Sequence, residues 1–259
     1  MTSNRSEKIA KSFGARAEAY ESHASLQRVV AARLAAKLPP LLAPRVLELG
    51  CGTGLLTRHL LKTYPDGDFR ITDLAPEMIA AAERNIVLPA GANLSFEVMD
   101  AARAEDAGRF DLIVTSMSLH WLADPAAALA CLRGLLNPGG TLLFSALGPE
   151  CFAEWREAVA AEGLADGLVP IAALPGLLEE ESAVMEESGL AFLRRLRAIG
   201  GLTPKEGYAP VSAGALRRVL RRLDEEHGGR VTWHIVYGRL SSMESSLAAS
   251  RSSPSMMPS

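Results

Sequence analysis

Cysteine is scarce in this chain of 259 residues, which has three. Cys51, Cys131 and Cys151 form no C-x-x-C pair and have no histidine cluster nearby, so the sequence contains neither a zinc motif nor a disulfide framework. We expect three reduced thiols and no metal site. This cysteine usage is typical of a cytoplasmic protein, and we expect that location.

Long apolar runs and a strong excess of one charge are also missing. No stretch is long enough to span a bilayer, and the first ten residues lack the apolar core of a secretory signal. A net charge of −3 gives no overall reason to expect nucleic acid. We therefore expect neither a membrane nor a nucleic-acid partner, and we expect a monomer.

The most informative stretch has the sequence RVLELGCGTG and covers residues 45–54. Its apolar start is typical of a strand buried on both faces of a parallel sheet. Gly50, Gly52 and Gly54 follow at alternate positions, and a helical pattern begins at Leu55. A strand, a glycine turn and a helix N-terminus together predict a cradle in which backbone N–H groups approach a ligand.

The spacing of these glycines differs from that of a dinucleotide fingerprint, which has its third glycine where this chain has Leu55. Glu48, two residues before the first glycine, is also foreign to that fingerprint. The pattern E-x-G-x-G-x-G resembles motif I of the class I S-adenosylmethionine-dependent methyltransferases. A turn that merely joins a strand to a helix is the alternative, so the residues that follow must decide.

Two acidic residues follow the next expected strands. Asp73 ends a strand at 69–72, where its carboxylate suits a ribose diol, although a helix N-cap is the alternative role. Asp100 ends a strand at 94–98, where it suits an adenine amino group. Parallel strands end at one edge of a sheet, and ligands of such sheets bind there. We expect both carboxylates beside the glycine turn.

The alternation of strands and helices predicts an α/β fold with a doubly wound, mostly parallel sheet. Asp124 and Pro125 predict the start of a helix, since Asp suits the N-cap and Pro the first position. Further strands are expected at 110–116, at 141–147 after an Asn-Pro-Gly-Gly turn, and at 230–238. Further helices are expected at 9–38, where Gly14 and Ser22-His23 are candidate breaks into two helices, and at 151–162, 189–201 and 212–227. Residues 1–8 are polar and expected to be loose.

Segments on both flanks narrow the resemblance to the malonyl-[acyl-carrier protein] O-methyltransferases, a family of biotin synthesis. They are residues 12–27, Leu119–Trp121, 192–201 and 231–238, and the likeness covers about residues 9–240. It implies seven strands, a helical cap over the cofactor site at 1–44, and a methyltransferase domain at 45–240 with lid and basic helices at about 163–228. The Ser-, Ala- and Met-rich composition of 241–259, which is not expected of this family, predicts a disordered tail. Residues 163–190 look short for this family's lid and sixth strand.

The resemblance implies that S-adenosylmethionine methylates the free carboxylate of a malonyl thioester on acyl-carrier protein, or on CoA. That carboxylate is ionised at neutral pH, so we expect no obligatory general base, and positioning in a dry site would supply much of the rate. The implied cofactor-binding residues are Glu48, Gly50, Gly52, Gly54, Asp73, Leu74, Asp100, Ala101 and Ser116.

Three residues are expected on the substrate side of the site. Tyr20, on an N-terminal helix, is the candidate to close it, and a core tyrosine is the alternative. His120 is a candidate to orient the carboxylate, and an ordinary surface histidine is the alternative. Trp121 is expected to pack beside the substrate rather than to bind it.

Runs of arginine mark two expected helices. Arg194, Arg195 and Arg197 lie on one, and Arg217, Arg218, Arg221 and Arg222 lie on the other. The resemblance favours a basic patch for an acidic carrier protein and its phosphopantetheine arm. Solvated helix faces, neutralised in part by nearby glutamates, are the alternative.

Two other functions remain open from the sequence. One is a small-molecule carboxyl or carbon methyltransferase of the trans-aconitate type, which would not need the basic helices. The other is a non-catalytic S-adenosylmethionine-binding assembly protein of the same fold, which would bind the cofactor without turnover.

Overall fold

One seven-stranded sheet organises the computed structural model, which describes residues 4–104, 108–168, 173–205 and 207–242. The strands are β1 (Arg45–Leu49), β2 (Asp68–Asp73), β3 (Asn93–Val98), β4 (Phe110–Ser116), β5 (Leu136–Leu147), β6 (Leu177–Glu186) and β7 (Arg230–Ser241). Their order is β3-β2-β1-β4-β5-β7-β6. The first five run parallel, and β7 is antiparallel to both β5 and β6. The predicted α/β fold with a mostly parallel sheet is confirmed.

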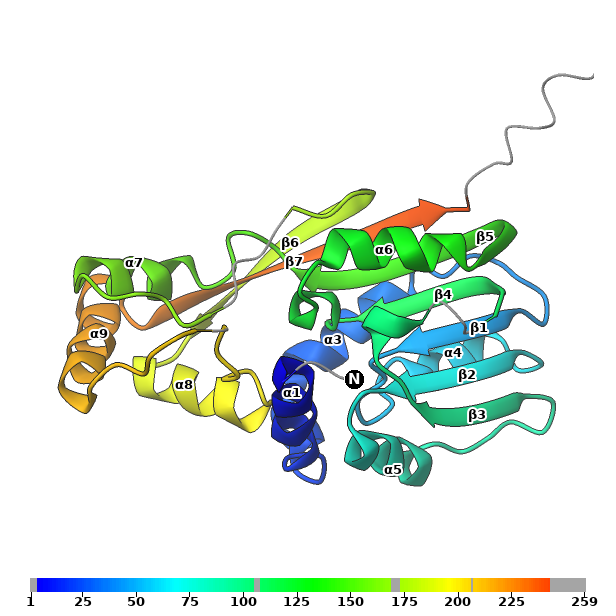
Figure 1. The fold of residues 1–259 in the computed structure, drawn as a ribbon, viewed down its shortest axis with the longest axis horizontal. Coiled ribbons are helices and arrows are strands. Elements are labelled where there is room, and N and C mark those ends of the chain that lie inside the picture. Colours follow the sequence, from blue (N-terminus) through cyan, green and yellow to red (C-terminus); the bar gives the residue numbers. More distant parts are fainter. Residues whose placement is uncertain (1–3, 105–107, 169–172, 206, 243–259) are drawn as a thin grey trace, which may run out of the picture.

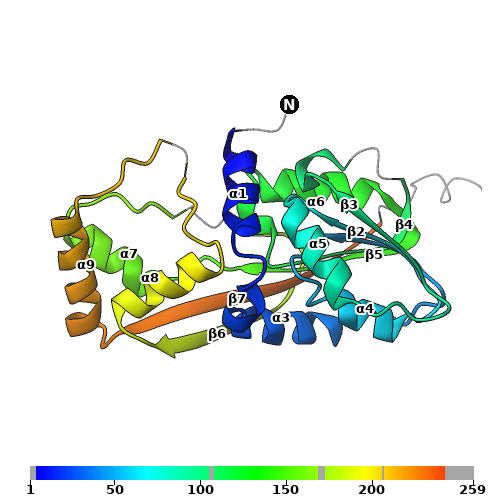
Figure 2. The same ribbon diagram turned by 90° about the horizontal axis from the view of Figure 1, so that it is seen from below.

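Helices cover both faces of the parallel strands. The helices are α1 (Asn4–Gly14), α2 (Tyr20–His23), α3 (Ser25–Ala35), α4 (Thr57–Thr63), α5 (Pro76–Asn85), α6 (Pro125–Gly134), α7 (Ala153–Ala161), α8 (Gly189–Ala198) and α9 (Ala213–Glu226). Figure 2 shows α3 and α4 on one side of the sheet and α6 on the other. Among the described residues, no helix combines the length and the apolar composition needed to cross a bilayer.

The central strand β1 explains this layering. Val46 packs into the core shared with α3, α4 and α5, while Leu47 and Leu49 pack into the core shared with α6. Successive side chains of a strand point to opposite faces, so a continuous apolar run needs cover on both. Glu48 is the single polar residue between them, and it too is buried.

The antiparallel strands carry a second group of helices away from the parallel sheet. Figure 1 shows β6 and β7 extending toward α7, α8 and α9, with α1 standing between these helices and the sheet. α9 packs against both α7 and α8, and α1 packs against α5. This arrangement places helices on two sides of the carboxyl ends of the parallel strands.

Three boundaries differ from the sequence predictions. α1 begins at Asn4, where residues 1–8 were expected to be loose. β6 lies inside 163–190, the segment that looked too short for a sixth strand; its glutamates are tolerated because it is an edge strand with an exposed face. β5 begins at Leu136, since a register shift opposite β4 takes the Asn-Pro-Gly-Gly turn into the strand. Most of the predicted tail, 243–259, lies outside the described residues.

Candidate functional site

The glycine turn after β1 depends on backbone conformations that favour glycine. Gly50, Gly52 and Gly54 have φ values of +68°, +56° and +89°. A Cβ on Gly50 would lie 2.2 Å from the Ser118 hydroxyl oxygen, and one on Gly54 would lie 3.0 Å from the Ile86 side chain. A Cβ on Gly52 would meet no atom within 4 Å. Gly50 and Gly54 therefore permit close packing, whereas Gly52 faces open space.

Asp73, at the end of β2, fastens the glycine turn. Its Oδ2 accepts a hydrogen bond from the Gly52 N–H at 2.8 Å, and its Oδ1 accepts one from the Ala75 N–H at 2.9 Å. Burial raises the pKa of this carboxyl, although the backbone donors oppose that shift. Ala75, rather than Asp73, occupies the N-cap of α5, so the N-cap alternative is wrong in its strict form.

Glu48 lies beneath the same turn. Its Oε2 accepts a hydrogen bond from the Thr57 hydroxyl at 2.7 Å, which joins β1 to the first residue of α4. Burial, with a smaller contribution from the charge of Asp73, raises the pKa of Glu48 to about 8 despite this bond. At neutral pH this carboxyl is therefore mostly protonated, and it supports the loop from behind.

A first cavity, of about 810 Å³, opens above these residues. It brings together seven of the nine predicted cofactor-binding residues, namely Gly50, Gly52, Asp73, Leu74, Asp100, Ala101 and Ser116. Glu48 lines a smaller adjoining cavity instead, and Gly54 packs against α5. Asp100 caps a short 3₁₀ turn, Ala101–Arg103, by accepting from the Ala102 N–H.

The first cavity has polar groups in its wall that suit the predicted cofactor. The Thr115 hydroxyl oxygen is buried at its wall and has no hydrogen-bond partner among the described residues. The open side of Gly52 leaves room for a ligand against the backbone. Buried polar groups are normally paired, so these features indicate a polar ligand. The described residues hold no group of three or more His, Cys, Asp and Glu side chains that suits a metal ion.

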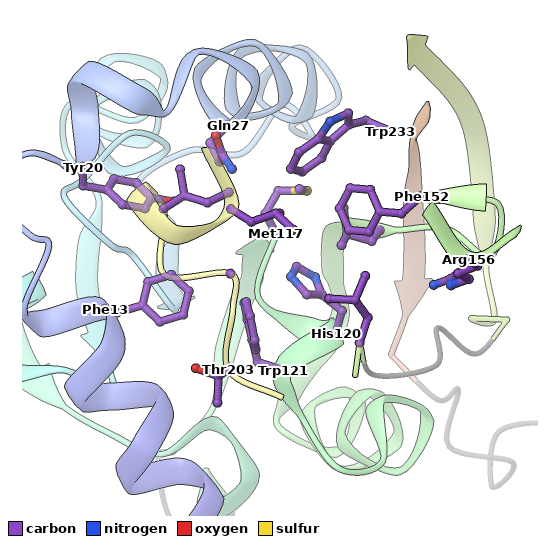
Figure 3. Close-up of a pocket in the computed structure, with 15 residues that line it drawn as sticks. Phe13, Tyr20, Gln27, Met117, His120, Trp121, Phe152, Arg156, Thr203 and Trp233 are labelled. Atoms are coloured by element: carbon purple, nitrogen blue, oxygen red, sulfur yellow. The ribbon is translucent and has the colours of Figure 1, made fainter. Parts of the chain in front are cut away.

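A second cavity, of about 690 Å³, adjoins the first. Phe13, Tyr20, Met117 and Trp121 line both, and they form the boundary between the two. Beyond the boundary the lining is largely apolar, with His120, Arg156 and Trp233 among its members (Figure 3). Two adjoining cavities that share one wall suit two ligands that meet at the boundary.

Tyr20 reaches this boundary from α2. Burial, together with the nearby charge of Asp73, raises the pKa of its phenol far above the usual value, so the ring is neutral. Glu21, which the sequence predictions missed, holds α2 in place. Its Oε1 accepts from the Thr53 hydroxyl at 3.0 Å and from Arg58 at 2.9 Å. No local sequence signal marks Glu21, since both partners lie more than thirty residues away.

His120 and Trp121 come from a 3₁₀ turn, Leu119–Trp121, that follows β4. Burial, with a contribution from the charge of Arg5, lowers the pKa of His120 to about 3, so its imidazole is neutral. The ring of Trp121 packs edge-on against Phe13, with centroids 5.3 Å apart. The Trp121 carbonyl also accepts a hydrogen bond from Arg5.

The seven predicted arginines fall into two groups. Arg195 pairs with Glu187 at 2.9 Å, Arg218 with Glu162 at 2.7 Å, and Arg222 with Glu162 at 3.1 Å. The other four, Arg194, Arg197, Arg217 and Arg221, are exposed and form no ion pair with any described residue. The arginines line neither cavity, so the structure keeps them apart from the other predicted site residues.

Comparison with known proteins adds independent information. A family model described as a methyltransferase domain matches residues 47–142. The malonyl-[acyl-carrier protein] O-methyltransferase of Magnetococcus marinus is 38% identical, over 91% of this chain and 92% of that protein. The biotin biosynthesis bifunctional protein BioCD of Bordetella avium is 40% identical over 89% of this chain, which spans 51% of that longer relative.

Solved structures show the same fold at low sequence identity. Coclaurine N-methyltransferase bound to N-methylheliamine and SAH has a TM-score of 0.50 at 14% identity, covering 85% of this chain and 73% of that chain. The [4+2]-cyclase SpnF has a TM-score of 0.51 at 16% identity, covering 83% of this chain and 81% of that chain. Because one fold supports such different reactions, the fold alone does not determine the reaction.

Proposed function

This chain belongs to the malonyl-[acyl-carrier protein] O-methyltransferase family, and from that premise we propose that it methylates the free carboxylate of a malonyl thioester on acyl-carrier protein. The methyl donor is S-adenosylmethionine, and the reaction is an early step of biotin synthesis. The observation that carries the proposal is the pair of joined cavities, one lined by the glycine turn and acidic strand ends, the other largely apolar.

In the first cavity, the chain supplies the groups that hold the cofactor. The Gly52 side of the turn leaves its backbone open, the carboxylates of Asp73 and Asp100 suit ribose and adenine donors, and the unpaired Thr115 hydroxyl offers a further contact. The bound cofactor supplies a methyl group on a positively charged sulfur.

At the boundary, the chain positions the acceptor and excludes water. The substrate carboxylate is ionised at neutral pH, so its attack needs no proton transfer. Opposite charges are neutralised as the methyl group moves, and an apolar surrounding such as that of Tyr20 and Trp121 favours this change. Both side chains are neutral, so neither forms an ion pair with the substrate carboxylate that would compete with the positive sulfur of the cofactor. Alignment of the two reactants then supplies several kcal/mol of the rate enhancement.

The carrier protein would approach the helices beyond the second cavity. Arg194 and Arg197, on α8, are exposed and form no ion pair with described residues, so their charges are available to an acidic surface. Arg195, which pairs with Glu187, is less suited to this role. We therefore assign recognition of the carrier protein to Arg194 and Arg197.

A methyl-transfer assay with labelled S-adenosylmethionine tests the proposed function. Malonyl-carrier protein, malonyl-CoA, free malonate and trans-aconitate serve as competing acceptors. We expect a base-labile methyl ester on malonyl-carrier protein. Exclusive labelling of trans-aconitate would instead support a small-molecule methyltransferase. Cofactor binding without transfer to any acceptor would overturn the proposal and leave a non-catalytic protein of this fold.

A further inference from the structure

Trp233 is a buried side chain whose polar atom has no partner. It lies on β7, is 2% exposed, and packs edge-on against Phe152 with ring centroids 4.7 Å apart. Its Nε1 is buried and has no hydrogen-bond partner among the described residues. An indole N–H can only donate, and buried donors are normally paired. A side chain without a polar atom would be buried here without this cost, so the N–H indicates an acceptor that comes with a ligand.

Other polar side chains line the same cavity. Trp233, His120 and the buried amide of Gln27 all line the second cavity, around Met117 (Figure 3). The Nδ1 atom of His120 is also buried without a partner. These three groups are neutral hydrogen-bonding groups in an otherwise largely apolar space.

The neutral character of these groups indicates which part of a substrate they bind. A carboxylate in an apolar cavity calls for a charged partner, which the positive sulfur of the cofactor would supply at the boundary, whereas a carbonyl oxygen is satisfied by a neutral donor. Arg156 lines the cavity, but it donates to the Pro149 carbonyl at 2.9 Å and lies 3.5 Å from the Asp166 carboxylate. Its charge is therefore already engaged.

The position of Trp233 also indicates a carbonyl oxygen as its acceptor. It lines only the second cavity, whereas Tyr20 and Trp121 line both. A malonyl group whose carboxylate meets the methyl donor at the boundary extends its other end into the second cavity. The acceptor at that end is the thioester carbonyl oxygen. We propose that the Trp233 Nε1–H donates a hydrogen bond to this carbonyl and that this contact selects thioesters. The assignment rests on the proposed function.

The test compares two acceptors that differ only at the carbonyl. They are malonyl-CoA and S-(2-carboxyethyl)-CoA, in which a methylene group replaces the thioester carbonyl. With the full chain, we expect kcat/KM to be at least about tenfold higher for malonyl-CoA, as one buried hydrogen bond implies. Trp233→Phe should lower kcat/KM about tenfold for malonyl-CoA and leave the thioether acceptor unchanged. Cofactor affinity should stay at the wild-type value, whereas the melting temperature should fall, because Phe does not fill the volume of the buried indole.

Trp155→Phe is the matched control, because the Trp155 Nε1–H already donates to Asp166 at 3.4 Å and the residue lies outside the cavity lining. This variant should keep the wild-type preference for malonyl-CoA. If Trp233→Phe also keeps that preference, the carbonyl assignment is overturned while the methyltransferase function stands. If the wild-type protein binds S-adenosylmethionine but methylates neither acceptor nor malonyl-carrier protein, both proposals fall.

Discussion

At the scale of single residues, Glu48 shows how burial changes the protonation state of a carboxyl group. Its carboxyl is buried under the glycine turn, beside the charge of Asp73, and a single hydrogen bond from Thr57 does not offset the loss of water. The folded protein therefore holds a proton that the unfolded chain releases. The turn above Glu48 consequently rests on a neutral group at neutral pH.

This gives a pH-dependent prediction for Glu48→Gln. The folded pKa of about 8 lies above the unfolded value of about 4.3, so the contribution of Glu48 to stability is complete below pH 4.3 and is lost as the pH rises through 8. Gln stays neutral and keeps an oxygen for Thr57. We expect the wild-type protein to lose roughly 4 kcal/mol relative to Glu48→Gln between pH 5 and pH 9.

Chemical denaturation at several pH values, without cofactor, measures this difference. Using the difference between the two proteins removes the contributions of other carboxyl groups, which are common to both. Stability curves that stay parallel from pH 5 to pH 9 would show that Glu48 is ionised throughout.

At the scale of elements, α2 is the part of the site with the least support of its own. It spans residues Tyr20–His23 and has no side-chain hydrogen bond at its N-cap. Glu21 instead ties it to the glycine loop through Thr53, to α4 through Arg58, and to the end of α5 through Asn85 at 3.3 Å. The helix that brings Tyr20 to the cavity boundary is thus fastened to the loop that faces the first cavity.

Glu21→Gln tests this coupling. The amide cannot form the ion pair with Arg58, so α2 should open more often, with amide exchange about tenfold faster at residues 20–23 and weaker S-adenosylmethionine binding. Hydrogen exchange followed by mass spectrometry and a binding titration measure both effects. Glu18→Gln, at an exposed neighbouring position, is the control and should change neither. Equal exchange in both variants would show that Glu21 does not hold the helix.

The elements also show what the sequence could predict. Asp124 caps α6 and Pro125 begins it, as predicted, because capping depends on neighbours in the chain. The strand β1 and the glycine turn after it were predicted for the same reason, because their apolar residues and glycines are consecutive in the chain. β6 was missed because an edge strand with exposed glutamates lacks the apolar alternation of a core strand. Glu21 and Trp233 were missed as site residues because their surroundings are assembled from distant segments.

At the scale of the whole molecule, the charges that could guide a carrier protein lie away from both cavities. α8 presents Arg194 and Arg197 to solvent, while Glu187 neutralises Arg195 between them. Exposed charges chiefly affect encounter with a charged partner, and salt screens them. The helices beyond the second cavity are therefore suited to docking rather than to chemistry.

Combined Arg194→Glu and Arg197→Glu substitutions should lower kcat/KM for malonyl-carrier protein about tenfold at low salt. Activity on malonyl-pantetheine, which has no carrier surface, should change less than about twofold, and the difference should shrink as salt is added. Arg84→Glu, at an exposed position of α5, makes the same kind of charge change elsewhere and should have little effect. Equal losses on both acceptors would place the arginines in folding or catalysis instead.

The antiparallel strands also affect how the molecule can deform. Residues Ile235–Ser241 of β7 pair with β5, whereas Arg230–His234 have only β6 as a strand partner. A two-stranded ribbon twists more readily than a wide sheet, and it keeps its ladder of hydrogen bonds as it does so. Torsion of this ribbon would carry Trp233 and the outer helices as one body while the parallel strands stay still. In mechanical terms, the first cavity lies on a wide plate, whereas the second lies where a narrow arm meets that plate, so a torsion of the arm would change the width of the second cavity more than that of the first.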